Sequence, residues 1–146
     1  MRMILINSAT EFLNTESSAF QALSKYKSFL NRFCIITQRR GIFECYEEAG
    51  VLFINIPKLT SILYVFRVAK ILRREQFVDA STFVNSGDPF LLAFFGIMLG
   101  KIIKRPLLIQ IHTDITSKYF RADGWLNRIY YLISNFTLAK AKVISC

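Results

Sequence analysis

The sequence lacks most of the motifs by which nucleotide-binding enzymes are identified. Its 146 residues include only six glycines, and neither GxGxxG nor GxxxxGK[ST] occurs. The segment that follows the first apolar run, residues 7–14, contains no glycine at all. Glycine gives a pyrophosphate room to approach the backbone, so these absences disfavour dinucleotide oxidoreductases and P-loop ATPases.

Cysteine and histidine are also scarce. The three cysteines, Cys34, Cys45 and Cys146, are widely spaced without a CxxC pair, and His112 is the one histidine. Scattered thiols favour a reducing, cytoplasmic setting over a disulfide framework. One histidine without suitably spaced thiolates or carboxylates does not form a zinc site. We therefore expect no metal and no cofactor.

Long apolar runs are missing as well. The amino terminus turns polar at Asn7, which makes its apolar segment too short for a signal peptide. The twelve uncharged residues 89–100 fall short of the roughly 20 that span a membrane. They form either a buried core helix, which we favour, or a segment lying at a membrane interface.

The composition that is present indicates a folded, basic domain. Hydrophobic residues make up 53% of the chain and the mean hydropathy is +0.34, so one domain with its own core is expected. Nineteen Lys and Arg against ten Asp and Glu give a net charge of +9. A charge of this sign favours anionic partners, such as phosphates, nucleic acid or acidic lipid.

Short apolar runs alternate with stretches of helical period, the pattern of βαβ units. It predicts an α/β fold with a doubly wound, mostly parallel, Rossmann-like sheet in a single domain, residues 1–146. Residues 41–50 are the least certain stretch, because residues 43–46 form either a short strand or a loop. The last strand has no closing helix, so we expect the domain to be one part of a longer protein. Strands are predicted at residues 3–7, 33–37, 51–56, 82–85, 107–112 and 142–145, and helices at 17–31, 58–75, 90–101 and 125–139.

His112 is the most informative single residue. It directly follows the apolar run of residues 107–111 and precedes Thr113 and Asp114. Ligands of open α/β sheets bind just past the carboxyl ends of such strands. A histidine there can donate and accept hydrogen bonds at neutral pH. The alternative is a structural histidine that closes the strand by bonding a neighbouring carbonyl.

A basic face is predicted on the helix of residues 58–75. Arg67, Lys70 and Arg74 are spaced i, i+3 and i+7, which places them on one side. Such a face is usually only solvated. With a net charge of +9, attraction to an anionic membrane surface is the alternative, at about 1 kcal/mol per basic residue.

Four segments together resemble a known family. Residues 85–90 end a strand with Asp88-Pro89-Phe90. Residues 105–114 form a proline-led strand ending in His-Thr-Asp, and residues 117–120 follow it. Residues 138–145 lead an alanine-rich helix into a strand. In this order they resemble the amino-terminal domain of retaining glycosyltransferases of the GT-B fold, of the family-4 kind that makes bacterial surface polysaccharides and glycolipids. The resemblance covers residues 79–146, and the preceding residues by topology.

The resemblance implies two Rossmann-like domains facing each other across a cleft, the first holding the acceptor and the second a nucleotide sugar. His112 would then orient the transferred sugar, Thr113 and Asp114 would shape the acceptor side, and Asp88 would bind substrate. The chain departs from the family in its glycine-free residues 8–14 and in lacking the donor domain. Alone, it is therefore expected to be inactive.

Three hypotheses of function follow. The first is a glycosyltransferase domain that transfers a sugar from a nucleotide sugar to a glycolipid or polysaccharide acceptor. It would act on the cytoplasmic face of the plasma membrane, when joined in cis or in trans to a donor domain. The second is a non-catalytic binding or membrane-docking subunit of a split glycosyltransferase. Nucleic-acid binding is disfavoured, because no recognition motif occurs and the charge is spread over several elements.

Overall fold

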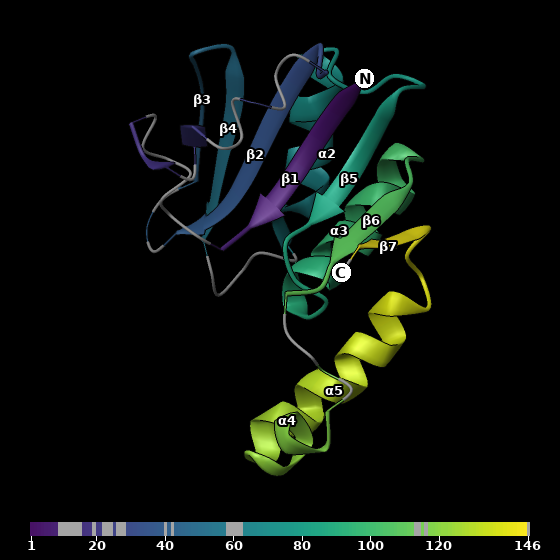
Figure 1. Ribbon diagram of the computed structural model, residues 1–146. Helices are drawn as coiled ribbons and strands as arrows, with labels where there is room; N and C mark the ends of the chain where they lie inside the picture. The colour runs from purple at the N-terminus through teal and green to yellow at the C-terminus, as the bar shows by residue number, and fades with distance from the viewer. Residues whose placement is uncertain are drawn as a thin grey trace.

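A seven-stranded sheet forms the body of the protein (Figure 1). The computed structural model describes residues 1–8, 16–18, 20–21, 25, 29–39, 41, 43–57, 63–112, 115 and 117–145, without the side chains of residues 39 and 121. The strand order is β3-β4-β2-β1-β5-β6-β7, and β3 is antiparallel to β4, whereas the other pairs are parallel. The strands are β1 (Arg2–Asn7), β2 (Arg32–Arg39), β3 (Glu44–Glu48), β4 (Val51–Pro57), β5 (Thr82–Ser86), β6 (Leu107–Gln110) and β7 (Val143–Ser145).

The helices divide into two groups. α2 (Val65–Arg74) and α3 (Leu91–Ile103) lie against one face of the sheet, while α4 (Lys118–Ala122) and α5 (Trp125–Leu138) form a hairpin that extends away from it (Figure 1). The predicted Rossmann-like α/β fold is confirmed. Of the helix predicted for residues 17–31, residues 19, 22–24 and 26–28 lie outside the described residues.

Both faces of the central strands are buried, which explains why they are nearly continuous apolar runs. Side chains alternate along β1: Ile4 and Ile6 belong to the core beneath α2 and α3, and Met3 and Leu5 to a second core on the opposite face. Phe20 covers part of that second core, with its ring 6.2 Å from the ring of Phe53. The two cores, one on each face of the sheet, hold the strands and therefore their ends in fixed positions.

α3 corresponds to the predicted helix of residues 90–101, and it is a core helix. Eight of its residues are buried, although Leu91 and Lys101 are exposed. Because most of the surface of α3 is buried in the protein, it is not available to lie at a membrane interface. Among the residues that the structure describes, no helix has the length and apolar character needed to cross a membrane.

Several predicted boundaries were wrong. The strand predicted for residues 107–112 ends at Gln110, although the amide of Ile111 still donates to the Ser145 carbonyl at 2.8 Å. Residues 44–48 are a strand because they pair with β4, which settles the open assignment of residues 41–50. α2 begins at Val65, after residues 58–62, which lie outside the described part. The short helix α4 was not predicted.

Candidate functional site

The point where the strand order reverses lies beside β1. From β1 the chain builds the sheet outward through β2 and β4 on one side and through β5, β6 and β7 on the other. In doubly wound sheets, ligands bind at the carboxyl ends of the strands at this point. The amide of Gly87, just after β5, donates to the carbonyl of Ile6 in β1 at 2.9 Å. The two strand ends are thereby tied together.

Gly87 allows this close approach. A Cβ atom added there would lie 3.1 Å from Asn7 Nδ2 and 3.4 Å from the Ile6 carbonyl oxygen. A larger residue would therefore require the Asn7 side chain to shift by a few tenths of an ångström. Sequence analysis missed this contact between Asn7 and Gly87, because only the parallel pairing of β1 with β5 brings the two residues together.

Asp88 shapes the turn from β5 into α3. Its Oδ1 atom accepts a hydrogen bond from the Phe90 amide at 2.7 Å, and its backbone carbonyl accepts one from the Ser86 hydroxyl at 2.8 Å. Burial raises the pKa of the Asp88 carboxyl, and hydrogen bonds from the Phe90 and Leu92 amides oppose that rise. The carboxyl is thus held in one orientation, with capacity left to accept hydrogen bonds.

The same turn joins the body to the helical hairpin. The Thr137 hydroxyl of α5 donates to the Pro89 carbonyl. The Phe90 ring lies 4.9 Å from the Tyr130 ring and 6.2 Å from the Phe120 ring, to which it is nearly parallel. These contacts place α4 and α5 next to the carboxyl edge of the sheet, so the hairpin borders the candidate site.

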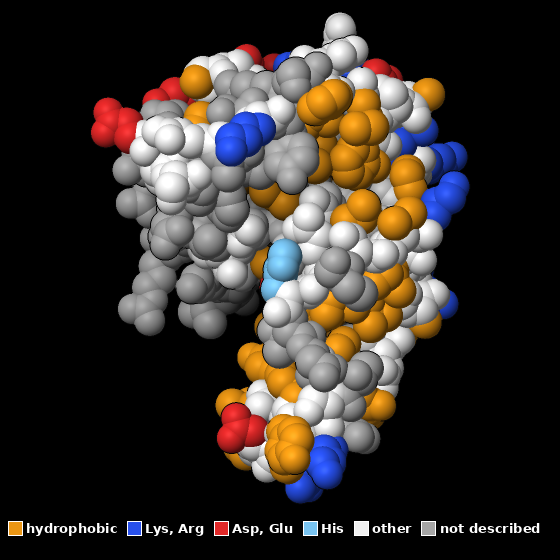
Figure 2. Space-filling model, in the orientation of Figure 1, with side chains coloured by type: hydrophobic (Ala, Val, Ile, Leu, Met, Phe, Trp, Pro, Cys, Tyr) orange, Lys and Arg blue, Asp and Glu red, His pale blue; other side chains and the backbone are white. Residues whose placement is uncertain are grey.

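His112 lies two residues beyond β6, just as Asp88 lies two residues beyond the neighbouring strand β5. Its side chain is exposed and forms no hydrogen bond with any other described residue. Figure 2 shows the imidazole at the surface, near where the hairpin leaves the body. The described contacts include no bond to a neighbouring carbonyl of the kind that the structural alternative invokes. Thr113 and Asp114 lie outside the described residues.

The three basic residues of α2 are exposed, as the helical spacing predicts. Two of them have partners: the Arg67 guanidinium lies 3.9 Å from the centre of the Phe43 ring, and Arg74 forms an ion pair with Glu75 at 2.9 Å. Lys70 forms no ion pair with a described residue. The face is basic, but its side chains do not converge on one point.

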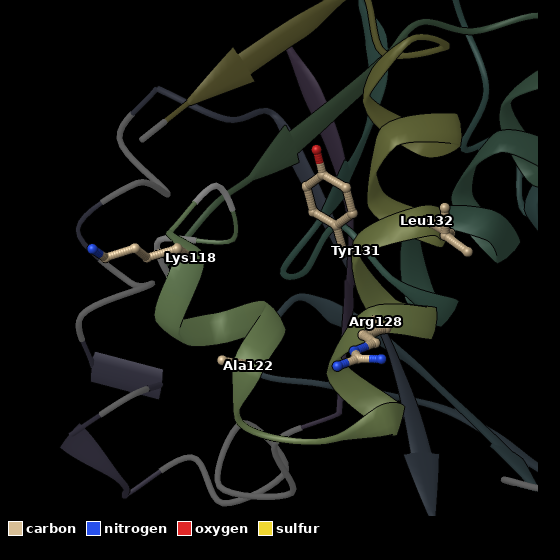
Figure 3. Close-up of a pocket in the computed structure, with 5 residues that line it drawn as sticks. All are labelled: Lys118, Ala122, Arg128, Tyr131 and Leu132. Carbon is tan, nitrogen blue, oxygen red and sulfur yellow. The ribbon is translucent and has the colours of Figure 1, made fainter.

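A hollow of about 480 Å³ lies between α4 and α5 and is lined by Lys118, Ala122, Arg128, Tyr131 and Leu132. Figure 3 shows the Lys118 ammonium pointing away from α5, with the Arg128 guanidinium far from it. The two cations therefore do not form a joint anion site. In the described part of the chain, no three His, Cys, Asp or Glu side chains are grouped in a way that could hold a metal ion.

Sheet order and helix placement define a doubly wound domain of the type that forms one half of a GT-B glycosyltransferase. No family model matches the sequence, and no curated protein matches it. Two solved structures match the fold. HepE of Anabaena, crystallised with UDP and glucose, has a TM-score of 0.56 and 13% identity over 99% of this chain. An α,α-trehalose-phosphate synthase (UDP-forming) from Burkholderia xenovorans, in complex with glucose-6-phosphate, has a TM-score of 0.54 and 11% identity over 98%.

Both of these proteins are GT-B glycosyltransferases, so the predicted half-domain fold is confirmed. This chain spans 37% and 39% of their lengths. At such low identity the likeness establishes the fold.

Proposed function

We propose that this chain is the acceptor-side domain of a retaining GT-B glycosyltransferase, which transfers a sugar from a nucleotide sugar to a glycolipid or polysaccharide. The observation that carries the proposal is the fold match, which extends over nearly the whole chain to two glycosyltransferases. One was crystallised with UDP and glucose and the other with glucose-6-phosphate. The activity requires a donor-binding domain, joined in cis or in trans.

In this proposal the carboxyl edge holds the reacting sugars. His112 orients the transferred sugar, Thr113 and Asp114 shape the acceptor side, and Asp88 accepts a hydrogen bond from a substrate hydroxyl. The position of Asp88 and His112 after adjacent parallel strands supports these roles. Holding two reactants in near-attack geometry can lower a barrier by roughly 7 to 11 kcal/mol. Positioning is therefore a sufficient task for this half, and it calls for no metal or cofactor.

Labelled-sugar transfer tests the proposal. The complete polypeptide that the gene encodes is incubated with radiolabelled UDP-glucose, other nucleotide sugars, and membrane lipid or polysaccharide fractions. We expect label to enter one acceptor fraction with release of the nucleoside diphosphate, and heat-inactivated protein serves as the control. If no donor yields transfer, even with a separately supplied donor domain, the catalytic proposal fails and the non-catalytic subunit is favoured.

Membrane docking on the cytoplasmic face is the second candidate, and the surface of α5 favours it. Trp125, Ile129, Leu132 and Phe136 are between 42% and 69% exposed and recur at helical spacing on the hairpin. Apolar side chains on a basic protein suit the interface of an anionic membrane. A second copy of this chain would carry the same positive charge, so charge complementarity favours lipid over self-association.

Vesicle binding tests membrane docking. Changing Arg67, Lys70 and Arg74 to Glu reverses the charge of the α2 face, and changing Ile129 and Leu132 to Ser removes apolar contact from α5. Each variant should bind vesicles containing phosphatidylglycerol less tightly than the wild type, and added salt should release the wild type. Equal binding to neutral and anionic vesicles, or no loss in either variant, contradicts docking.

A further inference from the structure

Five basic residues line one hollow at the amino-terminal edge of the sheet, on the opposite side from the candidate site. The hollow has a volume of about 270 Å³ and lies where α3 ends, β6 begins and α5 turns into β7. Figure 2 shows blue side chains along the edge of the molecule where Figure 1 places these turns. The basic residues that line the hollow are Lys101, Lys104, Arg105, Lys140 and Lys142, and no acidic residue lines it.

No described acidic residue forms an ion pair with any of the five. The helix macrodipole does not account for them, since the carboxyl end of a helix carries only about half a negative charge. The last carbonyls of α3 are also already bonded: Gly100 accepts from the Arg105 amide, Lys101 from the Lys104 amide, and Ile102 from the Arg73 guanidinium. The positive charge of the hollow therefore has no counterpart in the described protein.

One detail fixes the turn that carries these residues, and a second leaves a donor unsatisfied. Lys104 adopts a left-handed conformation with φ of 56°, at the helix-terminal position where glycine is usual and a side chain is strained. The Nε atom of Arg105 is buried and has no hydrogen-bond partner. A buried, unpaired guanidinium nitrogen costs free energy unless an acceptor satisfies it.

The backbone gives the hollow a fixed shape. A Cβ atom on Gly100 would lie 2.9 Å from the Arg105 carbonyl oxygen, so the turn is closed tightly against α3. The Lys142 amide donates to the Leu107 carbonyl at 2.9 Å, which places the α5–β7 turn beside the start of β6. Cations from distant parts of the sequence thus share one rigid frame.

We propose that this hollow binds a phosphate-bearing anion through Lys101, Lys104, Arg105, Lys140 and Lys142. The planar Arg105 fork with surrounding ammonium groups suits the geometry and charge of phosphate oxygens. The volume lies below the usual range for drug-sized ligands, roughly 300 to 1,000 Å³, and suits a phosphate or diphosphate group. The group belongs either to a small free anion or to a lipid headgroup. This site is separate from the proposed site of sugar transfer.

Calorimetric titration of the chain with inorganic pyrophosphate at low salt tests the site. The wild type should bind, and the double variant Lys104→Gln, Lys140→Gln should bind at least about tenfold more weakly, a change of 1.4 kcal/mol. Arg105→Lys keeps the charge but removes the fork, so it should also weaken binding. The matched control Lys118→Gln, Arg128→Gln makes the same charge change at two exposed cations of the helical hairpin and should leave the affinity within about twofold.

Circular dichroism establishes that each variant is folded. Absence of wild-type binding, or equal weakening by the control pair, overturns the proposal. A single-stranded RNA that binds far more tightly than pyrophosphate and loses affinity only in the hollow variant also overturns it, in favour of a nucleic-acid site. Displacement of pyrophosphate by vesicles with phosphatidic acid, but not by phosphatidylcholine alone, identifies a lipid headgroup as the source. Binding without such displacement identifies a free anion; both results support the site.

Discussion

The two edges of the sheet differ sharply around β5 and β6. At the carboxyl edge, where strands turn into helices, the described groups are a half-buried carboxyl, Asp88, and an exposed imidazole, His112. At the amino edge, where helices turn into strands, five cations line one hollow. The same strands hold both edges, yet the edges suit different ligands. We propose hydroxyl-bearing sugars for the first and a phosphate group for the second.

The comparison shows that net charge alone does not locate function. The charge of +9 is compatible with a membrane face on α2, a site at the carboxyl edge or a site at the amino edge. On α2, Arg67 lies against an aromatic ring and Arg74 is paired with Glu75. At the amino edge five cations line one hollow and form no ion pair with a described acidic residue. A hollow lined by cations without counter-charge is therefore a more specific signal than net charge.

The largest expected change in stability is at the amino edge, where Gly100→Ala would set a Cβ 2.9 Å from the Arg105 carbonyl oxygen. A backbone atom cannot move aside cheaply, so we expect a loss of roughly 1 to 3 kcal/mol in the free energy of unfolding. Gly96→Ala is the matched control, because its Cβ would lie at the same 2.9 Å from a side-chain tip, Leu107 Cδ1, in place of a backbone atom. Urea denaturation of both variants measures the difference. Equal losses would contradict the tight turn.

A smaller effect is expected at the carboxyl edge. Asp88→Ala removes the acceptor for the Phe90 amide and should cost about 1 kcal/mol relative to Asp88→Asn, which retains one. Because burial raises the folded-state pKa of Asp88, its ionisation lowers stability as the pH rises through that pKa. Asp88→Asn should therefore gain stability over the wild type between acidic and neutral pH. If Asp88→Asn were less stable than the wild type over this pH range, the result would contradict the burial of the Asp88 carboxyl.

The smallest effect is expected at Asp79, which precedes β5 at the amino edge. Hydrogen bonds from Ser81 lower its pKa most, with further lowering by Thr82 and the Arg2 guanidinium at 3.0 Å. Stability from this carboxylate is present above its unfolded pKa and is lost as the pH falls through the folded one. Asp79→Asn should thus be slightly less stable than the wild type at neutral pH, with the gap closing in acid. A constant gap across the pH range would show that ionisation plays no part.

The core strands were predictable because residues buried on both faces of a parallel sheet give short, continuous apolar runs. The end of β6 was not, since the apolar pattern continues to Ile111 while strand pairing stops at Gln110. β3 escaped a firm assignment because all five of its residues are exposed, and pairing with β4 alone defines it.

The site residues show the same division between local and tertiary information. The positions of Asp88 and His112 beyond strand ends followed from the sequence, because His112 directly follows an apolar run and Asp88 lies in the polar turn after the strand predicted at residues 82–85. The contact of Asn7 with Gly87 did not, since it depends on the pairing of β1 with β5. The basic hollow was equally hidden: its cations lie in two short segments, residues 101–105 and 140–142, which only the fold brings together.

One substitution tests most directly whether the carboxyl edge carries sugar transfer. His112→Ala is made in the complete encoded polypeptide, and the turnover number and melting temperature are measured on the same preparation. We expect turnover to fall by on the order of 100-fold, as loss of a positioning group can cause. The melting temperature should change little, because the imidazole is exposed and has no described hydrogen bond to lose. Normal turnover in a folded variant that melts several degrees earlier would contradict the account and make His112 a structural residue.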